Sequence, residues 1–262
     1  GGSQGLSFYL VPNIKAIEEV GLFNIIVEAM NQAFFTLSIG IGSMAIFGSY
    51  IDKKASLLGE SITIAALDTF VAIVAGLIIF PACFAYGVNP GAGPKLIFIT
   101  LPNIFNEIPG GQIWGALFFL FMSFAAFSTV IAVFENIMSF AGDLWGWSRK
   151  KAALINVFVV TLGSLPCILG FNLWSAFQPF GTGTGVLDLE DFFVSTIFLP
   201  AGSLIFVLFC VSRYGWGWDK YFAEVNEGNG LKIPKWIRPY FTYVLPVIIF
   251  IILTRGIWKT FF

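Results

Sequence analysis

The chain has 262 residues, of which 57% are hydrophobic and only 11% are charged. Soluble domains carry about a quarter charged residues, so the composition excludes an ordinary soluble domain and indicates an integral membrane protein. The net charge of −1 offers no basic surface for nucleic acid, and the absence of histidine excludes histidine-based catalysis and histidine metal sites. Cys83, Cys167 and Cys210 lie far apart in apolar stretches, which favours packing roles over a disulfide framework or metal site.

Six apolar segments are long enough to cross a bilayer, since a spanning helix needs about 20 such residues. They cover 22–50, 61–87, 112–141, 150–170, 189–212 and 237–261. The first and third are long enough to tilt or break. Residues 87–111 have Pro/Gly edges and a short amphipathic middle, which predicts a helical hairpin lying on the membrane surface. The chain begins without a methionine or a signal peptide, so we expect the C-terminal part of a longer protein or a truncated gene product.

The first segment contains "FFTLSIGIGS", in which Gly40 and Gly42 interrupt the apolar run. Such glycines permit either close packing of a neighbouring helix or a break in the helix itself. Thr36 and Ser38 precede them directly, and hydroxyls beside freed carbonyls suit a small hard cation. Irregular backbone at membrane depth is tolerated where it is buried in protein or lines a cavity. A break here would therefore indicate a binding site, with glycine packing as the alternative.

Asp68 is the one charge in "SITIAALDTFVAIVAGLIIF", about 10 Å into the second segment. A charge near the bilayer centre costs about 2.5–3.5 kcal/mol. The carboxyl group is either protonated or hydrogen-bonded within a helix bundle, or it is a cation ligand or proton carrier. The cost favours the functional interpretation.

The third segment carries Ala125, Ser128 and Thr129, whose spacing places them on one helix face. Two hydroxyls and a nearby carbonyl suit Na⁺. The alternative is that these hydroxyls bond back to their own helix, as serine and threonine in membrane helices commonly do.

The placement of lysine and arginine predicts the orientation in the membrane. With the loop before the first segment outside, ten of the fourteen basic residues fall in inside loops: Lys53, Lys54, Arg149, Lys150, Lys151, Arg213, Lys220, Lys232, Lys235 and Arg238. We expect both ends of this chain to lie outside the cell. An odd number of preceding helices would place the start of the whole protein in the cytoplasm.

Four stretches together resemble the neurotransmitter:sodium symporter family, whose bacterial members include the leucine transporter. "NQAFFTLSIGIGSMAIFGSY" is similar to the family's unwound sixth helix, and "AAFSTVIAVFENIMSFAGD" to its eighth. "GLSFYLVPN" resembles the extracellular stretch before helix six, and "PGAGPKLIFITLPNIFNEIPGG" the re-entrant loop between helices seven and eight. The resemblance covers the whole chain as helices six to eleven, so helices one to five are missing.

The resemblance implies an all-α integral membrane fold. It consists of the second inverted repeat of the leucine-transporter fold plus one additional helix, with six transmembrane helices of which the first is broken. Residues 1–262 would form a single membrane domain that is a fragment of a longer protein. Residues 22–212 would be the five-helix repeat, and 213–262 a cytoplasmic loop and the last transmembrane helix.

The resemblance also implies residue roles. Sodium site one would include Thr36 and Asp68, and sodium site two Ala125, Ser128 and Thr129. The substrate would contact the residues around the break and the facing helix, with Phe35 as an aromatic lid: Phe35, Thr36, Ser38, Ile41, Thr129 and Val133. Gly40 and Gly42 would form the helix break. No cofactor is implied beyond co-transported sodium ions.

Three acidic or phenolic residues match the gates of the family. Asp191 matches the acidic partner of an extracellular gate, and Tyr50 and Asp143 match the cytoplasmic gate. The arginines of both gates would belong to the missing helices. Ala72 replaces a serine that chloride-dependent members use, while Asp68 supplies a fixed negative charge beside the sodium, so we expect chloride independence.

The sequence thus predicts part of a sodium-coupled symporter for neutral hydrophobic amino acids in the inner cell membrane, working by alternating access. Its partners would be the amino acid, Na⁺, the lipid bilayer and the missing helices. The alternatives are a non-transporting amino-acid sensor or scaffold of the same fold, and a proton-coupled amino-acid carrier. An intramembrane aspartyl protease is disfavoured because Asp68 lacks a GxGD-like motif, and Glu135 lies near a helix end.

Overall fold

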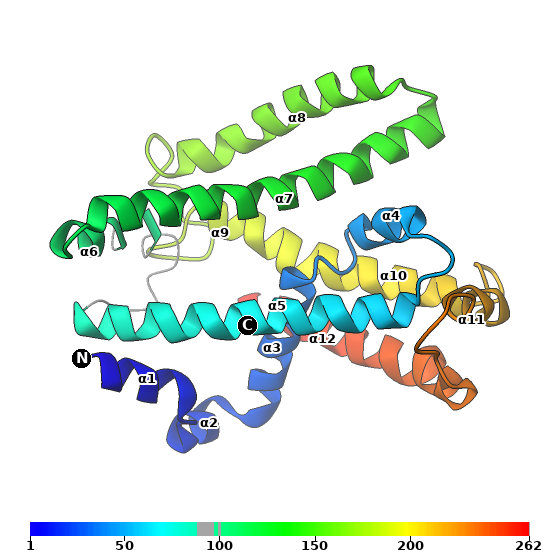
Figure 1. The fold of residues 1–262 in the computed structure, drawn as a ribbon, viewed down its shortest axis with the longest axis horizontal. Coiled ribbons are helices and arrows are strands. Elements are labelled where there is room, and N and C mark those ends of the chain that lie inside the picture. Colours follow the sequence, from blue (N-terminus) through cyan, green and yellow to red (C-terminus); the bar gives the residue numbers. More distant parts are fainter. Residues whose placement is uncertain (88–96, 99–100, 262) are drawn as a thin grey trace. The chain divides into compact units, whose positions relative to one another are not determined.

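The computed structural model describes residues 1–87, 97–98 and 101–261, and within them the chain is helical without a strand (Figure 1). The chain divides into two compact units. The first unit comprises Gly1–Leu22 and Ala65–Ile131, and the second comprises Phe23–Ile64 and Ala132–Phe262. Helices α5 (Leu57–Ala85) and α7 (Gly111–Trp145) each contribute to both units.

Five helical stretches of the described chain are long and apolar enough to cross a membrane. They are α5, α7, α8 (Arg149–Gly170), the stretch Val186–Val211 and the stretch Lys235–Phe261. They correspond to the second through sixth predicted segments. The first predicted segment is divided into α3 (Leu22–Thr36) and α4 (Ser43–Tyr50), so the predicted fold class, with its broken first helix, is confirmed. The third segment is one continuous helix of 35 residues.

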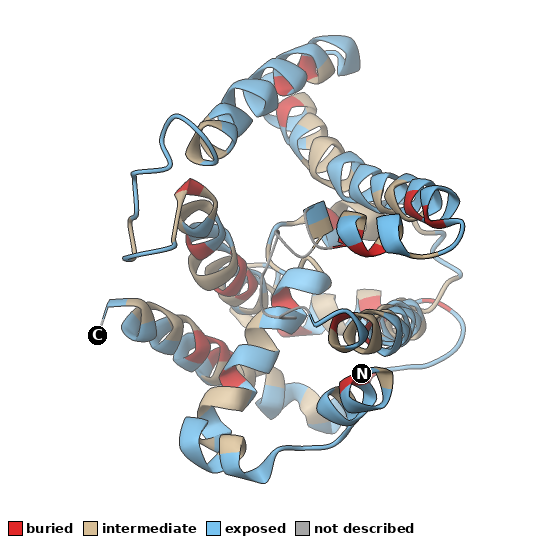
Figure 2. Cartoon of the chain, turned by 90° about the vertical axis from the view of Figure 1, so that its left-hand side faces the viewer, coloured by how far each residue is buried: buried red, intermediate tan, exposed pale blue. Residues whose placement is uncertain are grey.

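Most of the helical surface is exposed in the chain as it stands (Figure 2). At most 17% of the apolar window of each spanning stretch is buried. Large apolar side chains such as Phe70, Phe121 and Phe158 are exposed. Apolar helices of this kind need lipid or further membrane helices around them.

In the first unit, α1 (Gly2–Leu10) packs along the second half of α5 (Figure 1). The Tyr9 ring stacks on Phe80 with centroids 4.8 Å apart, and Phe8 contacts Phe80 and Phe84. Helix α2 (Ile14–Val20) follows, with an N-terminal cap from Asn13. The short α6 (Leu101–Glu107) packs on the start of α7 through Phe105 and Phe118. Helix α6 fits one arm of the predicted surface hairpin, while residues 88–96 and 99–100 of that hairpin lie outside the described residues.

The core of the second unit lies where α3 meets α10 (Leu199–Val211) and α12 (Leu245–Phe261). Its buried members are Val27, Phe34, Leu199, Ile249 and Ile252. In the first half of α3, Arg255 donates to Asn24 at 2.8 Å, and Lys259 pairs with Glu28. These contacts fix α3 against α12.

Two wide helical turns precede prolines in this unit. Residues Phe192–Phe198 (η2), which follow α9 (Val186–Asp191), form a π-helix ahead of Pro200, and Tyr240–Val244 (η4) form another ahead of Pro246. Proline has no N–H and its ring collides with the carbonyl four residues earlier. A wider turn accommodates that collision without ending the helix, which accounts for both π-helices.

The loops on the side predicted to be cytoplasmic are tied together in the second unit. Asn229 N–H donates to the Lys54 carbonyl at 2.8 Å, and Ser56 Oγ donates to the Leu231 carbonyl at 2.6 Å. Helix α11 (Trp218–Val225) packs its aromatic side chains against the start of the last helix, after the single turn η3 (Lys235–Ile237). Burial in this cluster raises the pKa of Tyr221 to about 12.

Candidate functional site

The break between α3 and α4 is built from a defined helix ending. Ile39 N–H donates to the Phe34 carbonyl and Ser38 N–H to the Phe35 carbonyl, which together form the Schellman pattern. That pattern needs a left-handed residue after the helix, and Ser38 supplies it with φ 50°. The structure therefore ends α3 by a serine, not by either of the glycines.

Gly40 and Gly42 then carry the chain to α4 with φ values of 93° and 94°, a region that favours glycine. Gly40 also lies against the backbone of α10. A Cβ on Gly40 would lie 2.2 Å from the Leu199 carbonyl oxygen, and one on Gly202 would lie 2.2 Å from the Gly40 carbonyl oxygen. Both interpretations of these glycines therefore hold: they permit the break in the helix, and Gly40 allows α10 to approach it closely.

Three polar side chains of α7 contact the broken helix. Asn136 Nδ2 donates to the Ile41 carbonyl at 2.8 Å, which satisfies a backbone group freed by the break. Tyr50, at the end of α4, donates to Glu135 Oε1 at 2.6 Å, and its hydroxyl lies 3.3 Å from Ser139 Oγ. Helix α7 is therefore hydrogen-bonded to the broken segment at both ends of α4.

Glu135 is also held by a forked ion pair. Arg149, the first residue of α8, donates to its two carboxylate oxygens at 3.1 and 2.8 Å. The Glu135 side chain is only 13% exposed, so the arginine and the Tyr50 hydroxyl offset the cost of burying its charge. Tyr50 and Asp143 remain predicted members of a cytoplasmic gate, and the contact of Tyr50 with Glu135 adds a residue that the sequence had not indicated. The adjacent polar pair Glu135 and Asn136 in an apolar helix was the signal that could have marked these contacts.

The residues predicted for the sodium sites fall in several places. Thr36 is the last residue of α3, and Asp68 is half-buried in α5. They belong to different compact units, so a joint site remains a prediction. Ser128 Oγ donates to the Ala125 carbonyl at 2.7 Å, which is the back-bonding alternative. The two oxygens are nevertheless neighbours, and the hydroxyl keeps lone pairs that can face a cation.

The remaining predicted residues surround the break or lie on the other helices. Phe35 is 50% exposed on α3, next to the buried Phe34. Val133 is half-buried on α7, three residues before Asn136. Asp143 is exposed near the end of α7, and Asp191, at the end of α9, accepts a hydrogen bond from Ser195 at 2.7 Å.

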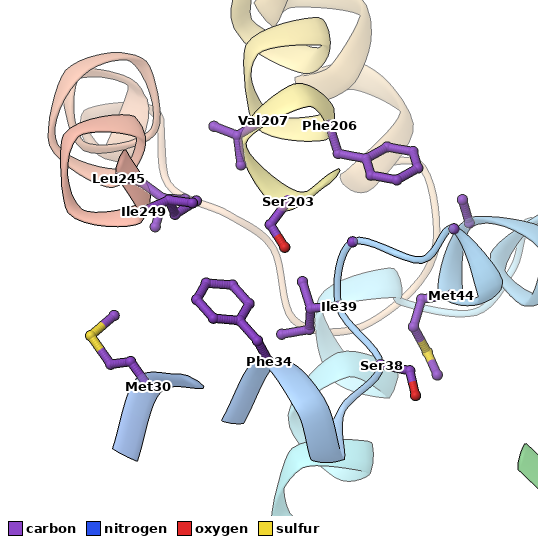
Figure 3. Close-up of a pocket in the computed structure, with 13 residues that line it drawn as sticks. Met30, Phe34, Ser38, Ile39, Met44, Ser203, Phe206, Val207, Leu245 and Ile249 are labelled. Atoms are coloured by element: carbon purple, nitrogen blue, oxygen red, sulfur yellow. The ribbon is translucent and has the colours of Figure 1, made fainter. Parts of the chain in front are cut away.

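An apolar cavity of about 380 Å³ lies on one side of the break (Figure 3). Phe34 and Ile39, the first and last residues of the Schellman ending, face Ser203 and Val207 of α10 across it. Leu245 and Ile249 of α12 form another wall. Of the residues predicted to bind substrate, Ser38 alone is among its described lining residues. The cavity therefore differs from the predicted substrate pocket.

Comparisons with known proteins agree on one family. A sequence model described as the sodium:neurotransmitter symporter family matches residues 1–261. An uncharacterized sodium-dependent transporter of Haemophilus influenzae is 29% identical, over 98% of this chain and 55% of its own length. The uncharacterized sodium-dependent transporter YhdH of Bacillus subtilis is 32% identical, over 87% of this chain and 49% of its own length.

A solved structure supports the same conclusion. The crystal structure of MhsT in complex with L-phenylalanine matches with a TM-score of 0.84 and 35% identity, over 98% of this chain and 57% of that one. The chain thus spans about half the length of the relatives it matches.

Proposed function

The chain belongs to the sodium:neurotransmitter symporter family, and we propose that it forms part of a sodium-coupled symporter for neutral hydrophobic amino acids. The family and the relatives are sodium-dependent transporters and not enzymes, and the chain is a multi-pass membrane protein. The observation that carries the proposal is the unwound segment at 37–42, where a membrane helix gives up its own hydrogen bonds in the middle of its span.

Two clusters would hold sodium. Thr36 and Asp68 would contribute to site one, and the Ala125 carbonyl with the Ser128 and Thr129 hydroxyls to site two. Sodium prefers oxygen ligands of this kind, and the adjacency of the Ala125 and Ser128 oxygens supports the second cluster. A carboxylate within a sodium site also supplies the negative charge that a chloride ion would otherwise bring, and Ala72 has no hydroxyl for chloride. Transport would therefore be independent of chloride.

The substrate would bind beside the break. Carbonyls of Phe35, Thr36 and Ser38 would receive its amino group, because carbonyls near the end of α3 carry partial negative charge. Its side chain would meet Ile41, Thr129 and Val133, and Phe35 would cover it. These apolar walls favour a neutral hydrophobic amino acid, and the L-phenylalanine in complex with MhsT is an amino acid of that class.

Gating would use the polar contacts at the two ends. Asp191 would close the outer side, and Tyr50 with Asp143 the cytoplasmic side. The bond from Tyr50 to Glu135, and the pairing of Glu135 with Arg149, support a closed cytoplasmic gate. Ions and substrate would drive the cycle through their different affinities for the outward-open and inward-open states.

The remaining helices would come from outside this chain. Helices one to five would supply the other half of both sodium sites and the arginines of both gates. The protein would lie in the inner cell membrane with the start of this chain outside, as the positive-inside distribution indicates.

Binding of radiolabelled phenylalanine to the purified full-length transporter, measured against Na⁺ concentration, tests the proposal. Ser128→Ala should shift the Na⁺ dependence to higher concentration. Ser123→Ala is the matched control, because Ser123 on the same helix also bonds back to its own backbone, at 2.7 Å. Binding that is indifferent to Na⁺ in the parent protein would refute the sodium-coupled function, and Na⁺-dependent binding without uptake would favour the sensor alternative.

A further inference from the structure

The Ile41 carbonyl is a backbone acceptor that the break takes out of the helix. In a continuous helix it would accept from the N–H of Ala45, but that N–H bonds to the Gly42 carbonyl. Asn136 Nδ2 replaces this partner at 2.8 Å from 95 residues further along the chain. One side chain of α7 therefore determines where the Ile41 peptide group points.

The carboxamide of Asn136 is also held in place by the shape of the break. A Cβ on Gly42 would lie 3.2 Å from Asn136 Oδ1 and 3.4 Å from Nδ2, so the amide group packs closely on the bare Cα of Gly42. Gly42 has φ 94°, which other residues rarely adopt. The glycine and the asparagine fit each other, so the Ile41 carbonyl is held by a hydrogen bond and the next residue by close packing.

Asn136 shares a helix face with residues proposed to line the substrate pocket. Thr129, Val133 and Asn136 are spaced by four and then three residues, so they project from one side of α7. Val133 and Ile41 are the proposed apolar walls of that pocket. Asn136 thus lies on the same α7 face as one wall and is bonded to the backbone of the other.

We propose that Asn136 is a positioning residue that sets the size selectivity of the substrate pocket. It acts through Ile41, without touching the amino acid itself. This inference rests on the proposed function in so far as Ile41 and Val133 bind the substrate side chain. By holding the Ile41 carbonyl, Asn136 fixes the direction of the Ile41 side chain and hence the space left for the substrate.

Replacing Asn136 by leucine removes the donor while keeping a side chain of similar size. The Ile41 carbonyl is then left without its partner, which favours rotation of the peptide group towards another donor or water. Gly42, freed from the Asn136 carboxamide, has no side chain of its own to oppose that rotation. The Ile41 side chain follows its backbone, and the pocket changes shape.

The test compares two neutral substrates in the full-length transporter. Competition binding with phenylalanine and alanine measures their affinity ratio, and uptake kinetics measure KM and kcat separately. Asn136→Leu should raise KM for phenylalanine about tenfold, change the phenylalanine-to-alanine ratio, and alter kcat much less. Asn156→Leu is the matched control, because Asn156 is a buried asparagine of another membrane helix, α8, and it should leave the ratio unchanged.

Hydrogen exchange of the peptides covering 37–45 separates this inference from the proposed function. Faster exchange there in Asn136→Leu, with the rest of the protein unchanged, is expected even if the parent protein transports no amino acid. The milder Asn136→Ser, whose hydroxyl is too short to reach the carbonyl, serves if the leucine variant does not fold. Unchanged exchange and an unchanged affinity ratio in a folded variant would overturn the positioning role.

Discussion

The contact between the break and α10 leads to a sharp prediction for Gly202. Substituting alanine places a Cβ 2.2 Å from the Gly40 carbonyl oxygen and 3.0 Å from its carbonyl carbon. Both atoms belong to the backbone, so relief requires moving the break or α10 by about 1 Å. Overpacking of this kind costs about 1–3 kcal/mol.

A matched glycine separates this collision from the general effect of alanine in a helix. A Cβ on Gly163 in α8 would have no described atom within 4 Å, so Gly163→Ala should be neutral or stabilising by up to about 1 kcal/mol. Thermal unfolding of the purified protein in detergent measures both variants. Gly202→Ala should lower Tm by about 2–10 °C, and Gly163→Ala should not lower it. Equal Tm values for the two variants would refute the close approach of the break to α10.

Three further predictions concern other parts of the second unit. Phe34→Ala should lower the free energy of unfolding by about 3–5 kcal/mol, because Phe34 is buried. Phe35→Ala, at an exposed position, should leave Tm nearly unchanged and raise KM for the substrate. Glu135→Gln removes the charge that holds Arg149, and should increase thiol labelling of cysteines placed on the cytoplasmic side of the break. Burial raises the pKa of Tyr221 to about 12, because the folded protein disfavours the charged phenolate. The free energy of unfolding should therefore be unaffected by this group below about pH 10 and fall as the pH rises towards about 12.

Each of these has a clear contrary result. Equal losses of stability in the two phenylalanine variants would contradict the assignment of Phe34 to the core and of Phe35 to a lid over the substrate. Unchanged labelling in Glu135→Gln would contradict a closed gate at that carboxylate. For Tyr221, the same fall in Tm between pH 10 and 12 in Tyr221→Phe would show that another group causes the pH dependence.

Local chemistry made much of this fold predictable. Apolar segments of about 20 residues identified the spanning helices, and Gly40 and Gly42 within one of them predicted the break. The ending at Ser38 was not foreseen, because serine seldom takes the left-handed conformation and no local rule selects it over the nearby glycines.

Contacts across the chain were harder to predict. Asn136 and Ile41 are 95 residues apart, and Tyr50 and Glu135 are 85 apart. Their pairing depends on how α7 crosses the broken helix, which hydrophobic periodicity does not specify. A polar residue in an apolar helix signals that it needs a partner, but it does not identify that partner.

Uptake of radiolabelled phenylalanine into liposomes containing the full-length transporter is the direct test of sodium coupling through Asp68. An inward Na⁺ gradient is applied, with Na⁺ or chloride replaced in parallel, and Asp68→Ala is compared with the parent protein. Uptake should require Na⁺, be unaffected by chloride replacement and be lost in Asp68→Ala. Uptake driven by a pH gradient alone, or undiminished in Asp68→Ala, would contradict it.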